Sequence, residues 1–261
     1  FGKNKVLQDI NLRVRKGEVH ALLGQNGAGK STLVKIITGV YSMNAGEIFM
    51  DGEPVRINSP KDSENAGISI IHQDQQLVPF FDVTRNAFLG SEIRGKGGKL
   101  NFKKMKELVD EKLKLIESDF TSDQQISSLS VGQREQVAIV TALLQNPKLL
   151  ILDEPTASLS SREIEKLFEV IGKLKKEGVT VIYISHHLDE IFRITDSITV
   201  LRDSRMQGTF STESISRKDV VSLMIGKELK DFYPKEEAVI GDTVLEVEDV
   251  YSGTLVKGAS F

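Results

Sequence analysis

Nine residues, GQNGAGKST at positions 24–32, restrict what this chain can fold into more than any other stretch. They match the pattern Gly, four residues, Gly-Lys-Ser/Thr, in which a glycine-rich turn points backbone N–H groups at phosphate oxygens. The apolar run at 19–23 predicts a buried strand before the turn, and the apolar spacing over 32–38 predicts a helix after it. An unrelated glycine-rich turn is the alternative, and by chance the pattern should occur in roughly one chain in a hundred of this length. The flanking strand and helix make that alternative minor.

The motif predicts a nucleotide site with a bound cation. The Lys30 ammonium would reach the β- and γ-phosphates, and the Ser31 hydroxyl would bind Mg²⁺. The start of the following helix adds a positive field to the site. The candidate nucleotide ligands in the loop are Gly24, Gln25, Asn26, Gly27, Ala28, Gly29, Lys30, Ser31 and Thr32.

Composition excludes several other classes of protein. A net charge of −3 argues against a general nucleic-acid-binding surface, and no apolar run is long enough to span a bilayer. The absence of cysteine excludes disulfides and cysteine-ligated metals, and it fits a cytosolic location. With 27% charged and 39% hydrophobic residues, the 261-residue chain is typical of a soluble globular protein with one large domain or two small ones.

The other segments predict an α/β protein with two additions. Alternating residues over 6–15 predict a half-exposed strand, and strands predicted at 47–50 and 55–57 complete an antiparallel β region beside the loop. Residues 84–140 are mainly helical in pattern and interrupt the α/β alternation, so we expect an inserted helical subdomain. One stripe of that segment is expected to face its core: Phe102, Met105, Val109, Leu113 and Ile116.

Polar side chains stand at the carboxyl ends of three predicted strands. Gln73 follows the strand at 68–71, Asp153 and Glu154 end the strand at 149–153, and His186 follows the strand at 179–184. Beside a phosphate loop, Asp153 can hold the hydration shell of Mg²⁺ and Glu154 can polarise water. A solvated carboxylate pair and an ordinary surface histidine are the alternatives.

Two more segments each allow two interpretations. Ser130 and Gly132 precede a helix predicted over 134–145, a place suited to an anion, although Ser130 also suits a plain N-cap. The apolar segment at 77–81 (LVPFF) is either a loop packed into the core or an exposed docking surface.

The last residues predict the start of a second domain. Residues 227–242 have the composition of a linker, and 243–250 predict a new strand. The pattern of 256–261 is similar to that of 7–12, so we expect 243–261 to be the truncated start of a second copy of the first domain.

Assembled in order, these motifs resemble the ATP-binding cassette of ABC transporters, and we take residues 1–226 as its nucleotide-binding domain. Six motifs follow the family's order: the Walker A loop at 24–32, the Q-loop residue Gln73, the signature at 129–133, Walker B at 149–153 with Glu154, the D-loop at 157–160, and the switch residue His186. Val131 replaces a glycine of the usual signature, and Ser160 stands where the D-loop usually has aspartate. Phe1 lies where the family has an aromatic residue that stacks on adenine.

The resemblance implies a fold and a set of ligands. The fold is α/β: a P-loop NTPase with a RecA-like core, an antiparallel β subdomain and an inserted α-helical subdomain at about 84–140. The ligands are ATP and Mg²⁺, with Ser31, Gln73 and Asp153 around the metal.

The resemblance also implies a role for each motif. Glu154 would orient or deprotonate the attacking water, His186 would contact the γ-phosphate, and Gln73 would be the third catalytic residue. The family sandwiches each ATP between two cassettes, so the signature of one cassette serves the ATP held by the other. The signature residues that would bind this second nucleotide are Ser130, Gly132 and Gln133.

Within the family, four segments are most similar to the tandem ATPases of bacterial monosaccharide importers of the ribose, xylose and galactose type: 71–73, 78–79, 86–90 and 154–160. This implies an ATPase that powers sugar import from the cytoplasmic face of the membrane as a peripheral subunit. The implied partners are a second cassette (in the same full-length chain or as a homodimer), a transmembrane permease docked near residues 74–90, and indirectly a solute-binding protein, with no nucleic acid. Other subunits choose the sugar, so its identity is not encoded here.

Two other functions fit parts of the sequence. A soluble cassette ATPase of translation would also contain two cassettes, but those proteins usually have Asn-His-Leu-Asp where this chain has Ala157-Ser158-Leu159-Ser160, and a net charge of −3 is not basic. A non-hydrolysing regulatory module would bind nucleotide without needing Glu154 and His186.

Overall fold

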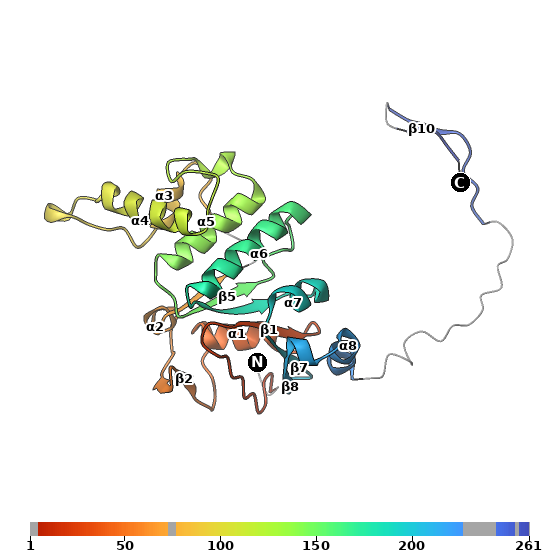
Figure 1. Cartoon of the computed structure of the whole chain (residues 1–261), viewed down its shortest axis with the longest axis horizontal. Helices are drawn as coiled ribbons and strands as arrows, with labels where there is room; N and C mark the ends of the chain where they lie inside the picture. The colour runs from red at the N-terminus through yellow and green to blue at the C-terminus, as the bar shows by residue number, and fades with distance from the viewer. Residues whose placement is uncertain (1–4, 73–76, 227–243, 254–255, 261) are drawn as a thin grey trace. The chain divides into compact units, whose positions relative to one another are not determined.

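A computed structural model describes the chain over residues 5–72, 77–226, 244–253 and 256–260. The chain divides into two compact units, Phe1–Lys227 and Glu228–Phe261 (Figure 1). The linker predicted at 227–242 lies outside the described residues.

One mixed sheet forms the centre of the first unit (Figure 1). Within the described residues its six strands lie in the order β4–β5–β6–β1–β7–β8, where neighbours from β4 to β7 are parallel and β8 is antiparallel to β7. The strands are β1 Val19–Gly24, β4 Ile68–Ile71, β5 Leu149–Asp153, β6 Thr180–Ile184, β7 Ser197–Arg202 and β8 Arg205–Ser211. The predictions of buried strands before the glycine loop and at 68–71, 149–153 and 179–184 are confirmed. These strands form apolar runs because helices or loops cover both faces of the sheet.

Different elements cover the two faces because successive side chains of a strand point to opposite sides. On one face, Leu22 and Ile182 pack with Leu33 of α1 (Lys30–Ile37). On the other face, Leu23 and Tyr183 belong to a larger cluster that, among the described residues, includes side chains of six helices. These helices are α3 Val83–Ala87, α4 Phe102–Leu115, α5 Val131–Leu143, α6 Ser161–Lys176, α7 Leu188–Ile194 and α8 Arg217–Ile225.

The segment between β4 and β5 is largely helical, as predicted. It contains α3 Val83–Ala87 and α4 Phe102–Leu115, and it ends with α5. Four of the five predicted stripe residues are buried, but Phe102 is 45% exposed, so its assignment to the core is wrong. Phe102 opens α4, and the Arg85 guanidinium, 5.6 Å from the ring centre, packs on it in place of the core. The shorter helices are α2 Pro60–Asn65 and the 3₁₀ turns Lys96–Gly98, Ile126–Ser128 and Thr212–Ser214.

The strand predicted at 6–15 is wrong, because residues 5–15 are all described and none lies in a strand. The predicted alternation is present: Ile10, Leu12 and Val14 are half-buried against the core on the α1 face. Alternation decides which side chains face a core, but a strand also needs a partner strand for its backbone groups. The antiparallel region is the hairpin of β2 Ile48–Met50 and β3 Glu53–Val55, whose second strand begins two residues earlier than predicted.

The second unit differs from its prediction as well. A strand is predicted at 243–250, but residues 244–249 lie outside any strand, and the structure has a short hairpin of β9 Val250–Ser252 with β10 Val256–Ala259. Val244 is fully exposed and Leu245 is 72% exposed. An apolar run forms a stable strand where it packs against a core, and among the described residues of this unit these two side chains have none.

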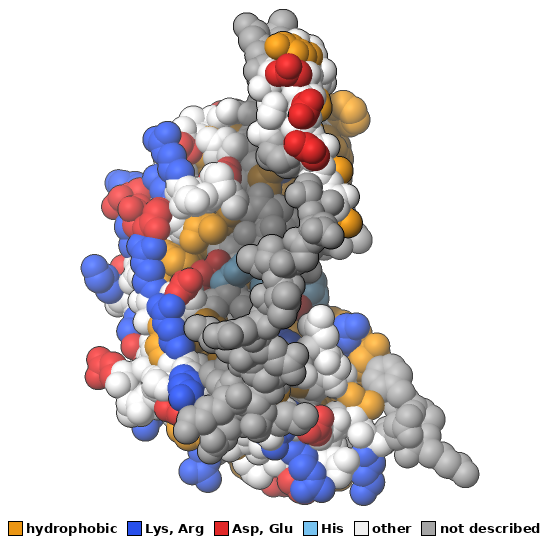
Figure 2. Space-filling model, turned by 90° about the vertical axis from the view of Figure 1, so that its right-hand side faces the viewer, with side chains coloured by type: hydrophobic (Ala, Val, Ile, Leu, Met, Phe, Trp, Pro, Cys, Tyr) orange, Lys and Arg blue, Asp and Glu red, His pale blue; other side chains and the backbone are white. Residues whose placement is uncertain are grey.

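Within the described part of the chain, none of the helices is long and apolar enough to cross a bilayer. Charges of both signs stand side by side along the left edge of the face in Figure 2. Along this edge, neighbouring charges of opposite sign partly cancel each other's fields.

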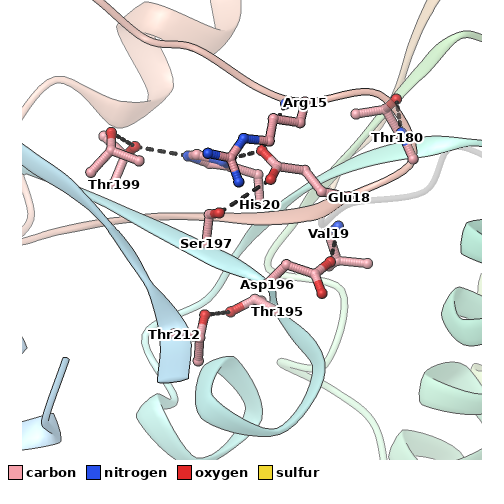
Figure 3. A network of polar contacts seen from close by, with 12 residues as sticks. Arg15, Glu18, Val19, His20, Thr180, Thr195, Asp196, Ser197, Thr199 and Thr212 are labelled. Atoms are coloured by element: carbon pink, nitrogen blue, oxygen red, sulfur yellow. Dashed lines mark hydrogen bonds and ion pairs between the residues drawn. The ribbon is translucent and has the colours of Figure 1, made fainter. Parts of the chain in front are cut away.

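A buried polar network holds the amino end of β1, at the opposite end of the strand from the glycine loop (Figure 3). Fully buried His20 donates from Nδ1 to Glu18 Oε1 at 2.8 Å, and its Nε2 lies 2.8 Å from Thr199 Oγ1 on β7. Ser197 Oγ donates to the other Glu18 oxygen at 3.1 Å, and Arg15 N–H donates to Oε1 at 2.8 Å. Burial lowers the pKa of His20, although Glu18 acts in the opposite direction. The imidazole is therefore neutral, and its contact with Thr199 links β1 to the neighbouring strand β7.

Candidate active site

The glycine loop connects β1 to α1 directly. Strand β1 ends at Gly24, and α1 begins at Lys30 with Gly29 as its N-cap. Gly29 has φ 107°, a left-handed conformation that side chains with a Cβ rarely adopt, and an added Cβ would lie 2.5 Å from Leu7 Cδ2. This turn directs the amino end of α1, with its unpaired N–H groups, into the site.

The loop and the end of β5 line one cavity of about 390 Å³. Its lining residues are Val6, Gln25, Asn26, Gly27, Gly29, Lys30, Ser31, Thr32, Asp153 and Glu154. Most of the predicted loop residues are therefore brought together with the predicted carboxylates. Gly24 and Ala28 are the two predicted loop residues that do not line the cavity. The Ala28 side chain is 4% exposed and packs in the core, while its N–H donates to Gln25 O at 3.1 Å. Val6 is a lining residue that the sequence analysis did not identify, since an apolar residue of an alternating segment carries no signal for a site.

Lys30 and Asp153 influence each other electrostatically in this cavity. Lys30 Nζ donates to Gly24 O at 2.7 Å and to Gln25 O at 3.2 Å. Partial burial lowers the pKa of Lys30, and the charges of Glu154 and Asp153 act against that shift. Burial also raises the pKa of Asp153, with Glu154 adding to the rise, while His72, Lys30 and Lys35 oppose it. Burial therefore disfavours the charged forms of Lys30 and Asp153, while the opposite charge of each favours the charged form of the other.

Glu154 and His186 meet at the carboxyl ends of neighbouring strands. Glu154 has φ 51°, an uncommon left-handed conformation, and its N–H donates to Ile184 O at 2.9 Å. This bond ties Glu154 to the end of β6, directly before the segment that carries His186. His186 Nδ1 lies 3.4 Å from Glu154 Oε2, and both side chains are partly exposed. A strained backbone at a polar strand end is a feature that clusters at functional sites.

A buried carboxylate supports the segment of His186. Glu190 Oε2 accepts hydroxyl hydrogen bonds from Thr156 at 3.0 Å, from Tyr183 at 2.8 Å and from Ser185 at 2.8 Å. Ser185 Oγ in turn accepts the N–H of His187 at 3.0 Å. Burial, with Glu190 next, raises the pKa of Tyr183, so the phenol stays protonated and donates. Glu190 was not predicted as a site residue. Its position on α7, four residues after His186, is the sequence feature that could have indicated a supporting role.

The predicted signature residues lie elsewhere. Among the described residues that line the cavity, none comes from 129–133. Ser130 is the N-cap of α5, which begins three residues earlier than predicted, and a capping box joins it to Gln133. Ser130 Oγ and Gly132 N–H both donate to Glu163 of α6. The N-cap interpretation of Ser130 is therefore confirmed. In addition, the Glu163 carboxylate accepts hydrogen bonds from the Ser130 hydroxyl and the Gly132 N–H.

Two predicted site residues, Phe1 and Gln73, lie outside the described residues. The nearest described neighbour of Gln73 is His72, which follows β4 and is exposed. His72 is close enough for its charge to lower the pKa of Asp153. No role for His72 was predicted, although it directly precedes Gln73 in the sequence.

Comparison with known proteins identifies the family. A family model described as "ABC transporter" matches residues 7–157. The ribose import ATP-binding protein RbsA of Bacillus subtilis (strain 168) is 44% identical over 249 residues, which are 95% of this chain and 50% of that protein. The chain thus spans about half the length of the curated relatives it matches.

Solved structures agree with this match. The ADP conformation of MJ1267, described as an ATP-binding cassette of an ABC transporter, superposes with a TM-score of 0.76 at 26% identity, covering 87% of this chain and 95% of that one. The dimeric post-hydrolysis state of the cassette MJ0796 bound to ADP and Pi superposes with a TM-score of 0.65 at 25% identity, covering 82% and 95%. The predicted α/β P-loop NTPase fold is confirmed. The chain belongs to the ABC transporter family.

Proposed function

We propose that this chain is the ATP-binding and ATP-hydrolysing part of a bacterial sugar importer. The observation that carries the proposal is that the phosphate loop, Asp153 and Glu154 line one cavity, with His186 Nδ1 3.4 Å from Glu154 Oε2. The relatives named for ribose import support a monosaccharide as the transported solute, and ribose is the first sugar to test.

The cavity suits the phosphates of ATP. Residues 25–32 supply backbone N–H groups, the amino end of α1 and the Lys30 ammonium, all of which attract anions. In ATP binding, Lys30 would exchange its contacts with Gly24 O and Gln25 O for phosphate oxygens. Phe1 would stack on the adenine.

The donor set fits Mg²⁺. The Ser31 hydroxyl and the Asp153 carboxylate line the same cavity, and both offer the hard oxygen donors that this ion prefers. Among the described residues no group of three or more His, Cys, Asp or Glu side chains could hold a metal by itself, which suits an ion bound mainly through substrate phosphates. When bound, Mg²⁺ would neutralise charge on the phosphates, with Gln73 as the third protein ligand.

Hydrolysis would depend on Glu154 and His186. Glu154 would hold the attacking water and accept its proton, while His186 would donate to the γ-phosphate as negative charge builds on it. Glu190 keeps the His186 segment in place through Ser185, so the two catalytic side chains reach the same point from neighbouring strands.

The partners follow from the family and from the surface. ATP would be sandwiched against the signature of a second cassette, in the same full-length chain or in a homodimer, and the dimeric MJ0796 structure supports such pairing. Residues 74–90 would dock the permease, and Phe80 in this region is 82% exposed. A solute-binding protein would deliver the sugar outside, with this chain held at the cytoplasmic face of the membrane. The ribose import relatives do not favour an action in translation.

The substitution Glu154→Gln tests the proposal. We expect this chain to bind Mg-ATP with unchanged affinity and to release phosphate at least about a hundredfold more slowly, because the amide cannot accept the proton of water. Calorimetry measures the binding, and a phosphate assay measures turnover. Glu177→Gln, an exposed glutamate at the end of α6, is the matched control and should keep full turnover.

The alternatives predict other results. Undiminished turnover in Glu154→Gln would remove this residue from the role of general base. ATP binding without turnover in the unsubstituted full-length protein would favour a regulatory nucleotide-binding module. Co-sedimentation with ribosomes in place of membranes would favour the action in translation.

A further inference from the structure

The Glu163 carboxylate accepts hydrogen bonds from residues at the amino ends of two helices, α5 and α6. Ser130 Oγ–H and Gly132 N–H, at the amino end of α5, donate to Glu163 Oε1 at 2.9 and 2.8 Å. The other oxygen, Oε2, accepts the N–H and the Oγ–H of Ser160 at 3.0 and 2.8 Å. Glu163 stands in the first turn of α6, directly after the segment that follows Glu154. It therefore links the signature loop to the loop behind the catalytic glutamate.

The signature loop is shaped to admit this carboxylate. A Cβ on Gly132 would lie 2.6 Å from Glu163 Cγ and 2.8 Å from Cδ, so a larger residue at this position would push the carboxylate away. The Ser160 N–H, the Ser160 hydroxyl and the Gly132 N–H, with the Ser130 hydroxyl after them, lower the pKa of Glu163 to about 2. Glu163 is consequently ionised throughout the physiological range, and uptake of a proton does not release it.

The donors that hold Glu163 are the ones needed by a nucleotide. In the proposed function, Ser130 and Gly132 bind the γ-phosphate of the ATP held by a second cassette. Carboxylate and phosphate oxygens use the same N–H and O–H donors, and both are favoured by the amino end of a helix. One hydroxyl and one N–H cannot serve both anions fully, and two anions at one helix end repel each other.

We propose that Glu163 is an internal anionic ligand of the signature loop, which the γ-phosphate of an opposing cassette's ATP must displace. This inference rests on the proposed function. Glu163 then acts against the pairing of cassettes until a nucleotide with a γ-phosphate is present, because a diphosphate lacks the group that takes its place. Displacement also breaks the contacts of Oε2 with Ser160, so the arrival of phosphate at the signature is transmitted to the segment behind Glu154.

The substitution Glu163→Gln removes the charge and keeps the shape. Glutamine at the third helical position preserves the capping box of α6, so the helix start should stay intact. With its one oxygen on the Ser160 N–H, the amide turns its NH₂ group towards the Gly132 N–H, so that donor is left for phosphate and no carboxylate charge repels the phosphate. Glu169→Gln is the matched control, since Glu169 is an exposed glutamate of the same helix and loses the same charge.

The experiment measures self-association of this chain by sedimentation equilibrium with Mg-ATP, with Glu154→Gln present in every sample to prevent hydrolysis. We expect Glu163→Gln to tighten dimerisation roughly tenfold, and Glu169→Gln to leave it unchanged. Unchanged or weaker association of Glu163→Gln, including a sample that stays monomeric at the highest concentration, would overturn the proposal.

Calorimetry on the same samples separates this proposal from the proposed function. Absence of ATP binding would contradict the nucleotide site itself. Normal ATP binding with association that Glu163→Gln does not tighten would contradict only the role of Glu163.

Discussion

At the scale of single residues, burial and neighbouring charges of opposite sign shift the pKa values of Lys30 and Asp153 in opposite directions. Burial lowers the pKa of Lys30 and raises that of Asp153, yet each group contributes a charge that favours the ionised form of the other. The two side chains are also held by the loop and by β5, so their charges stay close without a direct ion pair being needed. A triphosphate between them would favour the charged form of Lys30 still further.

Replacing Lys30 should therefore weaken nucleotide binding. We expect Lys30→Ala to lower the affinity for Mg-ATP by at least about tenfold, because charge-assisted hydrogen bonds to phosphate are lost. Calorimetry measures the change. Lys176→Ala, at an exposed site on α6, serves as the control and should bind normally. Equal affinities for the two variants would contradict the assignment of the phosphate loop.

Replacing Glu190 should destabilise the fold. Glu190→Ala leaves the hydroxyls of Thr156, Tyr183 and Ser185 without their buried acceptor. The expected loss in the free energy of unfolding is roughly 3 kcal/mol. Chemical denaturation measures it, with the exposed Glu177→Ala as a control expected to stay within about 0.5 kcal/mol of the unsubstituted chain. A loss below about 1 kcal/mol would mean that water replaces the carboxylate.

At the scale of elements, β1 is held at both ends by different chemistry. Its carboxyl end turns sharply through the glycine loop, and its amino end is pinned by the neutral imidazole of His20 between Glu18 and Thr199. The second feature makes the stability of the sheet depend on pH. The folded-state pKa of His20 lies below its ordinary value of 6.5, so the unfolded chain binds a proton there before the folded chain does.

The lowered pKa of folded His20 determines how the free energy of unfolding changes with pH. The contribution of neutral His20 is fully present above pH 6.5 and falls as the pH decreases below it, by at most about 1.4 kcal/mol per pH unit. The pKa of buried Glu135 is raised by burial to about 7, so its contribution falls in the opposite direction, as the pH rises from 4.5 towards 7. The raw stability curve therefore mixes two opposed trends.

Comparison with a variant isolates the histidine. We expect the difference in unfolding free energy between the unsubstituted chain and His20→Gln to be constant above pH 7 and to shrink as the pH falls from 6.5 to 5. Denaturant titrations at each pH measure this difference. A difference that is constant across the whole range would show that His20 keeps its ordinary pKa in the folded chain.

At the scale of the whole molecule, the proposed permease contact concerns an exposed apolar side chain. Phe80 is 82% exposed and belongs to the segment 74–90 that we propose as the permease contact. We expect Phe80→Asp to abolish binding of the chain to membranes that contain the permease while leaving ATP binding intact. Co-sedimentation measures the binding.

The matched control for this surface is Phe49→Asp. Phe49 is another exposed phenylalanine, on β2, and is 55% exposed. Its substitution should leave co-sedimentation unchanged. Equal loss in both variants would indicate that general surface apolarity, and not a specific contact at Phe80, holds the chain to the membrane.

Several features of this molecule could be predicted from its sequence because they depend on residues close together in the chain. The glycine loop requires particular residue types for its backbone, so its place between β1 and α1 is predictable without a structure. Buried parallel strands are continuous apolar runs, and carboxylates such as Asp153 and Glu154 at the end of one signal a site at the edge of the sheet. These features depend on neighbours in the chain, which a sequence displays.

Only the tertiary structure decided which distant groups meet. The alternation of Ile10, Leu12 and Val14 indicated the buried side correctly but not a strand, because pairing depends on a partner elsewhere in the chain. The contacts of Glu163 with Ser130, and of Glu190 with Thr156, join segments about 30 residues apart. The sequence determined the glycine loop and the buried strands beside it, and packing determined their partners, since hydrogen bonds between separate elements follow from how the helices lie on the sheet.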